Sequence, residues 1–239
     1  KNKMSHLILI RHGQSQWNLE KRFTGWVDVD LAPNGKLEAC KAGELIKELR
    51  LNIDFFFCSY QKRAIETLNL VLNTLRIKNN NIIKSWQLNE RHYGSLTGLN
   101  KDEMKKKLGE KKIQEFRRSW DIAPEPLNQN SPYHPLNIEI YKNVPKDKIP
   151  DTESLKDTFE RVTKYYEEKI SDKIEKNIII AAHGNSIRAL CKYLFKISEK
   201  DISKLEIPTG NPLLIEFENN SVKNARYLDK ERAQDLINF

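Results

Sequence analysis

Short apolar runs that alternate with amphipathic helical stripes are the feature that most constrains how this chain can fold. The runs at 6–10, 54–58, 177–182 and 213–217 have the length and composition of buried strands. Between them, apolar residues recur at the spacing of one helical face, as at Ala42, Leu45, Ile46 and Leu49. This order predicts an α/β fold of three layers, with a mostly parallel central sheet and helices on both faces.

Length and proline content indicate how that fold is organised. A chain of 239 residues suits one domain, which we assign to residues 4–239. Residues 1–3 precede Met4 and are expected to lie outside the natural start of the protein. Six of the nine prolines fall in residues 119–151, so this insertion is predicted to be irregular, either a lid over a site or a tethered surface loop. Residues 229–239 are interpreted as a C-terminal tail.

Composition narrows the classes of partner without choosing among them. The formal net charge of +8 suits nucleic acid, an anionic membrane or small anionic substrates. The lysine runs at 105–107 and 111–112 are interpreted as a solvated helix face, so nucleic acid is not expected as a partner. No apolar run approaches the ~20 residues of a membrane span, and the three cysteines form no Cys-x-x-Cys pair. We therefore expect a cytoplasmic protein that does not bind membranes.

Two histidines follow directly after predicted strands. His12, between Arg11 and Gly13, comes after the first strand, and His183 with Gly184 comes after the third. In such sheets ligands bind beyond the carboxyl ends of the strands, so both histidines fall at the expected ligand edge. A single histidine is more often a surface or core residue, but two His-Gly pairs at strand ends are much less easily incidental.

The chemistry that these residues favour is phosphoryl transfer. Neutral imidazole, with an unperturbed pKa of roughly 6.5, can accept a phosphoryl group and release it again. Arg11, Arg63 and His183 would supply cations for the phosphoryl oxygens. Arg63 falls at the start of the helix after the second strand, where a bound anion would be favourable. No Walker loop and no metal-spaced carboxylates occur, so no metal is expected.

Seven segments carry a resemblance to a known family. They are LIRHGQSQWN at 9–18, FTGWVDVDL at 23–31, LNERHYG at 88–94, LTGLNK at 96–101, FRRSW at 116–120, AAHGNSIR at 181–188 and IPTG at 207–210. The first resembles the signature of the histidine phosphatase superfamily, and the others look like its phosphoglycerate mutase branch. The similarity runs from about Met4 to about Tyr227, so it implies a phosphoglycerate mutase-like fold for nearly the whole chain.

The resemblance implies roles for individual residues. His12 matches the family's phosphorylated nucleophile, and Glu90 matches the proposed general acid and base. Four side chains match those around the transferring phosphoryl group, namely Arg11, Arg63, His183 and Asn18. Gly184 matches a backbone N–H donor to the same group. The remaining matches are groups that hold the rest of the substrate, namely Thr24, Gly25, Tyr93, Lys101, Arg117, Arg118 and Asn185.

The resemblance also implies an activity. It is that of a glycolytic and gluconeogenic isomerase that interconverts 3-phosphoglycerate and 2-phosphoglycerate through phosphohistidine, primed by 2,3-bisphosphoglycerate and without a metal. Its partners would be small phosphorylated three-carbon acids, and its assembly a homodimer or a dimer of dimers. A bisphosphoglycerate synthase or phosphatase on the same site is the main alternative. A non-catalytic phosphate-ligand-binding protein is a further one.

Two groups of residues keep more than one interpretation. Arg91 and His92 flank Glu90 and would lower the pKa of its carboxyl, whereas burial and phosphate oxygens would raise it. Taken alone, Glu90 is equally well explained by a structural pairing with an arginine. Arg117 and Arg118 are either a solvated helix end or are carried onto the substrate by the segment that follows them.

Two departures from the family pattern affect the expected activity. Gln14 stands where many members carry glutamate, which removes a negative charge close to the nucleophile. Asp229 directly follows Leu228, where the family continues with glycine and a longer tail that helps cover the site. A shorter tail would admit water and favour hydrolysis of phosphohistidine, so the balance between mutase and phosphatase is left open.

Overall fold

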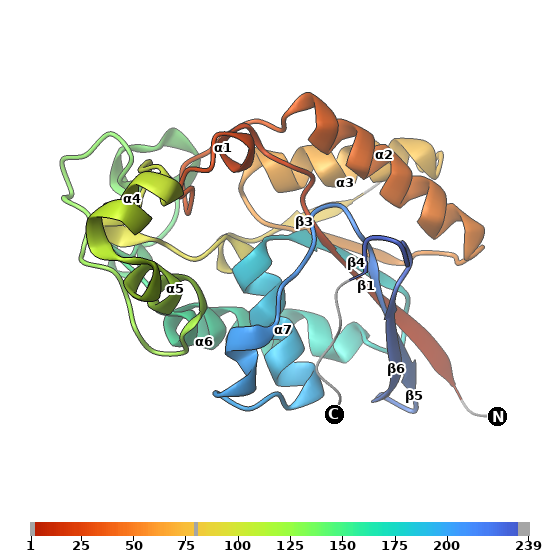
Figure 1. The fold of residues 1–239 in the computed structure, drawn as a ribbon. Helices are drawn as coiled ribbons and strands as arrows, with labels where there is room; N and C mark the ends of the chain where they lie inside the picture. The colour runs from red at the N-terminus through yellow and green to blue at the C-terminus, as the bar shows by residue number, and fades with distance from the viewer. Residues whose placement is uncertain (1–2, 79–80, 234–239) are drawn as a thin grey trace.

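Six strands form a single sheet in the computed structural model, which describes residues 3–78 and 81–233 (Figure 1). The strands are β1 (Met4–Arg11), β2 (Phe55–Cys58), β3 (Ile82–Lys84), β4 (Ile178–Ala182), β5 (Leu213–Glu218) and β6 (Ser221–Tyr227). Their order across the sheet is β3-β2-β4-β1-β5-β6. The first four strands along the chain pair in parallel, and β5 and β6 add an antiparallel edge beside β1. The predicted mostly parallel sheet is confirmed.

Helices cover both faces of this sheet, as predicted (Figure 1). The first face carries α2 (Pro33–Glu48) and α3 (Lys62–Thr74), and the second carries α6 (Leu155–Tyr165) and α7 (Gly184–Phe195). Side chains that alternate along each strand explain this arrangement. In β4, Ile178 and Ile180 pack in the apolar cluster with α6 and α7, whereas Ile179 and Ala181 pack in the cluster with α2 and α3.

The remaining helical elements are shorter. They are α1 (Gln16–Leu19), α4 (Lys101–Leu108), α5 (Glu110–Arg118), the 3₁₀ turns η1 (Trp86–Leu88), η2 (Gly94–Leu96), η7 (Ser171–Lys173) and η8 (Asp201–Lys204), and the π-helical turn η6 (Tyr166–Ile170). Figure 1 shows α4 and α5 together at one side of the sheet. Apolar periodicity does not predict these two helices, because only Met104, Ile113 and Phe116 are buried among many charged residues.

Two edge strands also escape the apolar pattern. The three residues of β3 are at most half-buried, and most of β6 is exposed or half-buried. These segments become strands because their backbone N–H and C=O groups pair with β2 and β5. The run of asparagines at 79–81 predicts a turn from the sequence, but residues 79 and 80 lie outside the described residues.

The proline-rich segment 119–151 is irregular and is anchored by buried aromatic residues. Its short 3₁₀ turns are η3 (Pro135–Asn137), η4 (Glu139–Tyr141) and η5 (Lys146–Lys148). Tyr141 is buried beside Trp26, and its hydroxyl donates to the Trp26 carbonyl at 2.6 Å. The buried His134 ring contacts Asp151 Oδ1 at 2.7 Å, which ties the middle of the segment to its end.

The parallel register of β1 and β4 brings the two His-Gly pairs together. Arg11 is opposite Ala182, and the His12 N–H donates to the Ala182 carbonyl at 3.0 Å. The ring centroids of His12 and His183 therefore lie 5.0 Å apart. Both histidines occupy one edge of the sheet because parallel strands end on the same side.

Backbone contact fixes the loop after β1 against α2. A Cβ atom at Gly13 would lie 2.1 Å from the Gly35 carbonyl oxygen, and one at Gly35 would lie 2.0 Å from the Gln14 carbonyl oxygen. The Gln14 carbonyl also accepts the Ala32 N–H at 2.9 Å, just before α2 begins. Two glycines thus allow the helix to pack directly on the backbone that carries His12.

Replacing Gly35 with alanine is expected to destabilise the protein. Helix propensity alone predicts a gain of about 1 kcal/mol, because glycine is the poorer helix former. Displacement of α2 from the loop after β1 should outweigh that gain and lower the free energy of unfolding by about 1–3 kcal/mol. Urea denaturation followed by circular dichroism measures the change.

A matched control lies one residue further along the same helix. Lys36 is exposed, so Lys36→Ala should change the free energy of unfolding by less than about 0.5 kcal/mol. A Gly35→Ala protein more stable than the unmodified chain would contradict the close packing of the two backbones.

Candidate active site

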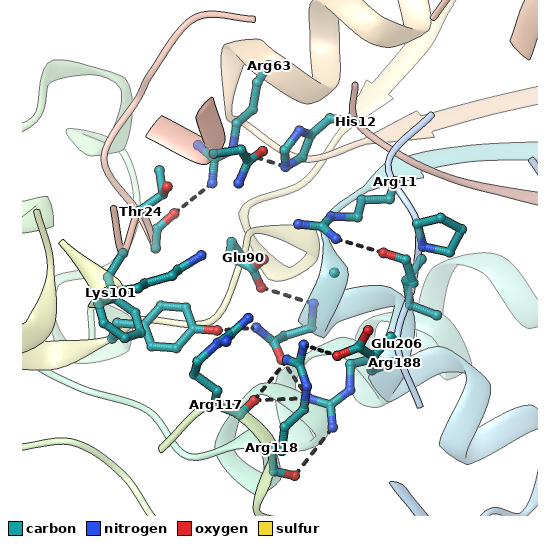
Figure 2. Close-up of a pocket in the computed structure, with 18 residues that line it drawn as sticks. Arg11, His12, Thr24, Arg63, Glu90, Lys101, Arg117, Arg118, Arg188 and Glu206 are labelled. Atoms are coloured by element: carbon teal, nitrogen blue, oxygen red, sulfur yellow. Dashed lines mark hydrogen bonds and ion pairs between the residues drawn. The ribbon is translucent and has the colours of Figure 1, made fainter. Parts of the chain in front are cut away.

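A cavity of about 220 Å³ opens at the carboxyl edge of the sheet (Figure 2). All the predicted site residues except His183 line it, namely Arg11, His12, Asn18, Thr24, Gly25, Arg63, Glu90, Tyr93, Lys101, Arg117, Arg118, Gly184 and Asn185. Residues that the sequence does not assign to the site also line it, namely Phe23, Arg188, Glu206, Ile207 and Pro208. The described segment 119–151 contributes no lining residue.

His12 is held as a neutral imidazole with one nitrogen available. Its Nδ1 lies 2.6 Å from the Gly13 carbonyl oxygen, which can only accept, so Nδ1 carries the proton. Nε2 is then the unprotonated nitrogen, and Arg63 Nε donates to it at 3.4 Å. Burial, followed by the charges of Arg63 and Arg11, lowers the pKa of His12 well below 6.5. This is the form of histidine that can attack phosphorus near neutral pH.

His183 lies behind His12 rather than in the cavity wall. It is fully buried, and its Nε2 lies 2.7 Å from the Ser59 hydroxyl oxygen. Burial, followed by the charge of Arg63, lowers the pKa of His183 well below 6.5. The ring is therefore uncharged near neutral pH, unlike the cation that the sequence suggested at this position.

Backbone carbonyls hold the two arginines nearest to His12. Arg63 Nη2 donates to the Gly25 carbonyl at 2.8 Å, and Arg11 Nη1 donates to the Ile207 carbonyl at 2.7 Å. A carbonyl is neutral, so it orients a guanidinium group without cancelling its positive charge. A carboxylate in the same place would cancel that charge. Both positive charges consequently remain available to an anion beside His12.

The anion predicted at the start of α3 is a carboxylate of the protein itself. Asp28 Oδ1 accepts the N–H of Lys62, the first residue of the helix, at 2.8 Å. Arg63 follows immediately and turns its guanidinium group toward the cavity, where Figure 2 shows it beside His12.

Glu90 presents its carboxylate to the middle of the cavity (Figure 2). Its Oε1 accepts the Arg91 N–H at 2.8 Å and the Asn185 N–H at 3.1 Å. Within residues 3–78 and 81–233, no lysine or arginine side chain forms an ion pair with it. The structural pairing of Glu90 with an arginine is therefore wrong, and its second oxygen faces the cavity without a cation bound to it.

The side chains of the two residues that flank Glu90 in sequence point away from its carboxylate. Arg91 Nε donates to the Glu153 carbonyl at 2.9 Å, and His92 Nδ1 accepts the Gly94 N–H at 2.8 Å. Burial lowers the pKa of His92 to about 3, so this ring carries no charge near neutral pH. Neither the Arg91 nor the His92 side chain therefore forms the ion pair with the Glu90 carboxylate that their sequence positions suggest.

A chain of hydrogen bonds orients the polar groups beyond Glu90. Asn185 Nδ2 donates to the Tyr93 hydroxyl at 3.0 Å, and Asn185 Oδ1 accepts from Arg188 Nη1 at 2.9 Å. Because Arg188 can only donate, it determines which way the amide points. The Tyr93 hydroxyl accepts in this chain and keeps its proton for a ligand.

Asn18, Thr24 and Gly25 form the wall on the side of α1. Asn18 Oδ1 accepts the Ser15 N–H at 3.0 Å, which leaves the amide nitrogen of Asn18 to donate into the cavity. Gly25 has a φ of +59°, and a Cβ there would lie 3.2 Å from the Arg91 carbonyl oxygen. A larger residue would therefore be strained where the backbone borders the cavity.

Arg117 and Arg118 end α5 and line the cavity, so the interpretation of a solvated helix end is wrong. Arg188, which the sequence does not single out, supports them and is only 2% exposed. It donates to the Ile202 carbonyl at 2.7 Å and to the Arg118 and Arg117 carbonyls at 3.3 and 3.5 Å. The last carbonyls of a helix lack intrahelical donors, so Arg188 positions the end of α5. The sequence signal that could have identified Arg188 is its position among the apolar residues of α7, where a charged side chain is unusual.

Lys101, at the start of α4, is a cavity cation whose charge depends on its surroundings. Burial, followed by the charges of Arg117 and Arg11, lowers the pKa of Lys101 from 10.5 to about 7. An anion bound in the cavity would favour the charged ammonium group and raise this pKa again. Anion binding is thus coupled to proton uptake at Lys101.

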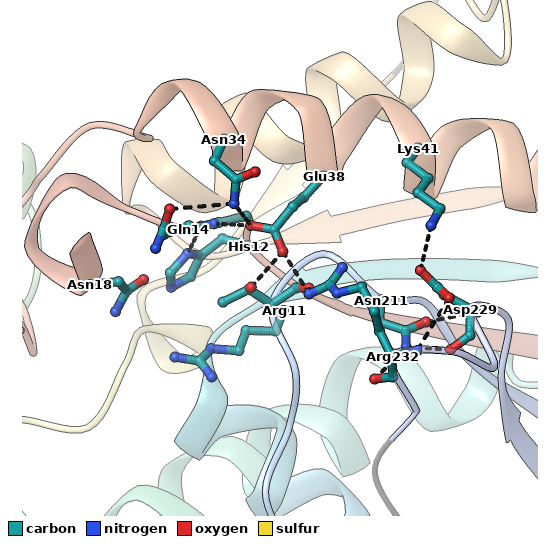
Figure 3. Close-up of polar contacts among 12 residues, drawn as sticks. Arg11, His12, Gln14, Asn18, Asn34, Glu38, Lys41, Asn211, Asp229 and Arg232 are labelled. Atoms are coloured by element: carbon teal, nitrogen blue, oxygen red, sulfur yellow. Dashed lines mark hydrogen bonds and ion pairs between the residues drawn. The ribbon is translucent and has the colours of Figure 1, made fainter.

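Gln14 and the C-terminal tail meet at Glu38 on α2 (Figure 3). Glu38 Oε1 accepts the Gln14 N–H at 2.9 Å, and Oε2 accepts from the Thr209 hydroxyl and from Arg232 Nη2, both at 2.7 Å. The Gln14 side chain accepts from Asn34 at 3.4 Å. A glutamate at position 14 would place a second carboxylate beside Glu38, which explains why a neutral amide suits this chain.

The first residues of the tail are docked rather than open. Asn211 Nδ2 donates to the Asp229 carbonyl at 2.9 Å, and the Asp229 side chain pairs with Lys41 at 2.8 Å. The rest of the predicted tail, residues 234–239, lies outside the described residues. An effect of the tail on hydrolysis stays a prediction.

The described residues offer neither a metal site nor a membrane-spanning helix. Among the described residues, no group of three or more His, Cys, Asp or Glu side chains is placed to hold a metal ion. None of the described helices is long and apolar enough to cross a membrane. The three cysteines are free thiols.

Sulfate binding near pH 7 is expected to be accompanied by proton uptake, because a pKa of about 7 leaves Lys101 only partly charged before binding and a bound anion favours the charged form. Sulfate does not titrate in this range, so the proton comes to the protein. Calorimetric titrations in two buffers of different ionisation enthalpy measure the uptake.

Lys101→Met should abolish this uptake, whereas Lys112→Met, on the exposed side of α5, should leave it intact. Equal uptake by both variants would show that another group titrates.

A family model and individual relatives assign this chain to the same family. The sequence model of the histidine phosphatase superfamily (branch 1) matches residues 7–134 and 126–230. A 2,3-bisphosphoglycerate-dependent phosphoglycerate mutase of Pelagibacter ubique is 66% identical over 239 residues, covering 99% of this chain and 100% of that protein. A protein of the same name from Caulobacter sp. is 50% identical and covers 98% of both chains.

Solved structures with the same architecture are more distant in sequence. The alpha-ribazole phosphatase from Shigella flexneri has a TM-score of 0.69 at 20% identity, covering 98% of this chain and 100% of that chain. A mycobacterial glucosyl-3-phosphoglycerate phosphatase has a TM-score of 0.66 at 18% identity, covering 94% and 97%. These two show the fold, and the closer sequence relatives show the branch. The chain therefore belongs to branch 1 of the histidine phosphatase superfamily and, within it, to the phosphoglycerate mutases.

Proposed function

We propose that this protein interconverts 3-phosphoglycerate and 2-phosphoglycerate through a phosphohistidine at His12. The observation that carries the proposal is the unprotonated Nε2 of His12, buried beside arginines that carbonyls hold. The 66% identity with a relative named as a phosphoglycerate mutase supports the choice of substrate. A cavity of about 220 Å³ suits a phosphorylated three-carbon acid.

The first half-reaction moves a phosphoryl group from His12 Nε2 to the free hydroxyl of phosphoglycerate. The P–N bond breaks as the new P–O bond forms, and Glu90 accepts the hydroxyl proton. Arg11 and Arg63 stabilise the charge on the phosphoryl oxygens throughout. The neutral ring is a good leaving group and a good nucleophile, so the same nitrogen serves both half-reactions.

The second half-reaction reverses these roles at the other oxygen. After the substrate reorients within the cavity, His12 accepts the second phosphoryl group and Glu90 returns its proton to the oxygen that is released. Lys101, Arg117 and Arg118 hold the carboxylate and the phosphate that are not reacting. Several cations around one cavity are consistent with both orientations of an acid that carries anionic groups at each end.

The priming molecule fits the same residues. The cations around the cavity suit 2,3-bisphosphoglycerate, which when bound supplies the phosphoryl group that first loads His12. The proposal includes no metal. A cytoplasmic location stays a prediction from the sequence composition, and a homodimer or dimer of dimers stays a prediction from the resemblance.

Phosphorus NMR tests the activity directly. With 3-phosphoglycerate and a chelator, 2-phosphoglycerate should appear rapidly only after a catalytic amount of 2,3-bisphosphoglycerate is added. His12→Gln should lower the rate at least about 10⁴-fold, because the covalent route is lost. Inorganic phosphate as the main product would instead assign a phosphatase to this site.

A histidine on the same strand provides the control. His6 is half-buried at the other end of β1 and contacts Asn177 at 3.0 Å, outside the cavity. His6→Gln should retain nearly full turnover. Equal loss in both variants would point to damage of β1 rather than to the nucleophile.

Glu90→Gln should separate proton transfer from binding. The amide oxygen can still accept the two backbone N–H groups, so KM should change by less than about threefold. Loss of the proton acceptor should lower kcat by about 10²–10⁴-fold. Steady-state kinetics measures both, with Glu115→Gln on α5 as a control. An unchanged kcat would remove Glu90 from the mechanism.

A further inference from the structure

The cavity has two ends with different electrostatic support. Figure 2 shows His12 and Arg63 at one end, and Arg117, Arg118 and Glu206 at the other. In the part of the chain that the structure describes, Arg118 is the cavity arginine that is paired with a carboxylate. The others are oriented by neutral groups or carry no ion pair, so their charge is not cancelled.

The pair of Arg118 and Glu206 is well formed. Glu206 Oε1 accepts from Arg118 Nη2 at 2.8 Å, and the Arg118 side chain is 16% exposed. Glu206 immediately precedes Ile207 and Pro208, which line the cavity with it. The hydrogen bond from Arg118 lowers the pKa of Glu206, so this carboxylate is ionised whenever a phosphate ligand is.

An anionic ligand group and Glu206 require the same donors. A phosphate or carboxylate that binds Arg118 must either replace Glu206 or lie beside its negative charge, and both cost binding free energy. A displaced Glu206 has room on its other side, where a groove lined by Lys111 and Lys204 also contacts Arg118. The exchange of one partner for the other therefore requires only a side-chain rotation at an exposed carboxylate.

We propose that Glu206 is an affinity-determining residue that competes with the distal anionic group of the substrate for Arg118. The inference rests on the proposed function for the identity of that substrate. The competition weakens binding and speeds release, because Arg118 regains a partner as the ligand leaves. An enzyme that must release its product on each turnover gains from such a partner, since uniform tight binding does not raise kcat.

Calorimetry with 3-phosphoglycerate tests the proposal on the full chain without the priming bisphosphate, so that turnover does not interfere. Glu206→Gln keeps an acceptor for Arg118 but removes the charge, and Glu206→Ala removes both. Each should lower the Kd by about two- to fivefold, the range expected for a partly exposed ion pair. The gain should shrink in 0.5 M sodium chloride, because the effect is electrostatic.

A matched control removes the same charge elsewhere. Glu139 pairs with Lys142 at 2.7 Å on the surface and does not line the cavity, so Glu139→Gln should leave the Kd unchanged. An unchanged Kd in both Glu206 variants would reduce the pair to a surface contact and overturn the proposal. Weaker binding in both would also overturn it, because Glu206 would then be orienting Arg118 for the ligand.

The proposed function is tested separately by phosphorus NMR on the unmodified protein. Turnover by that protein with an unchanged Kd in the Glu206 variants would reject only the inference about Glu206. Absence of turnover with tighter binding in the variants would reject only the proposed reaction.

Discussion

The site depends on buried guanidinium groups that are held by neutral carbonyls. Arg11, Arg63 and Arg188 are each oriented by the backbone of a different segment, at Ile207, Gly25 and Ile202. Burying a charge without a counter-ion is costly, and the carbonyl dipoles offset only part of that cost. The protein consequently keeps a concentrated positive charge that an anionic ligand neutralises. This concentration of positive charge suits an anionic ligand that carries several negative charges.

The surroundings that hold these arginines also favour one protonation state of His12. Burial and the adjacent arginines both favour the neutral ring of His12, and the Gly13 carbonyl selects which nitrogen keeps the proton. The proposed phosphoryl acceptor and the cations that would stabilise the phosphoryl charge therefore come from one arrangement. Burial and the neighbouring arginines likewise lower the pKa of Lys101 to about 7, which makes its charge depend on what the cavity contains.

The position of His12 depends on the sheet and on α2 together. The register of β1 against β4 sets its distance from His183, and the contact between Gly13 and Gly35 holds its loop from the other side. Glu38 on α2 then links this loop to the segment at Thr209. The nucleophile is thus supported by elements that the chain brings together from three distant regions.

Much of the fold follows from local pattern, because strand and helix periodicities are short-range and the sheet is buried on both faces. Strands β1, β2, β4 and β5 and the helices that cover them were predictable in this way, as was the ligand edge. The edge strands β3 and β6 and the charged helices α4 and α5 were not, because their stability comes from pairing and docking rather than from an apolar face. For the site, the resemblance identified most of the lining residues but did not assign Phe23, Arg188, Glu206, Ile207 and Pro208.

The sequence by itself determined which residues are candidates for the chemistry, since His12, Glu90 and the arginines stand in recognisable motifs. Only the tertiary structure decided the charge and orientation of those residues. The side chains of the residues that flank Glu90 bind other partners, and His183 is uncharged behind the cavity. Glu206 pairs with Arg118 across 88 positions of the chain. The physical reason is that protonation and ion pairing depend on burial and on distances of a few ångströms. Such distances are set by packing between segments, which no local pattern records.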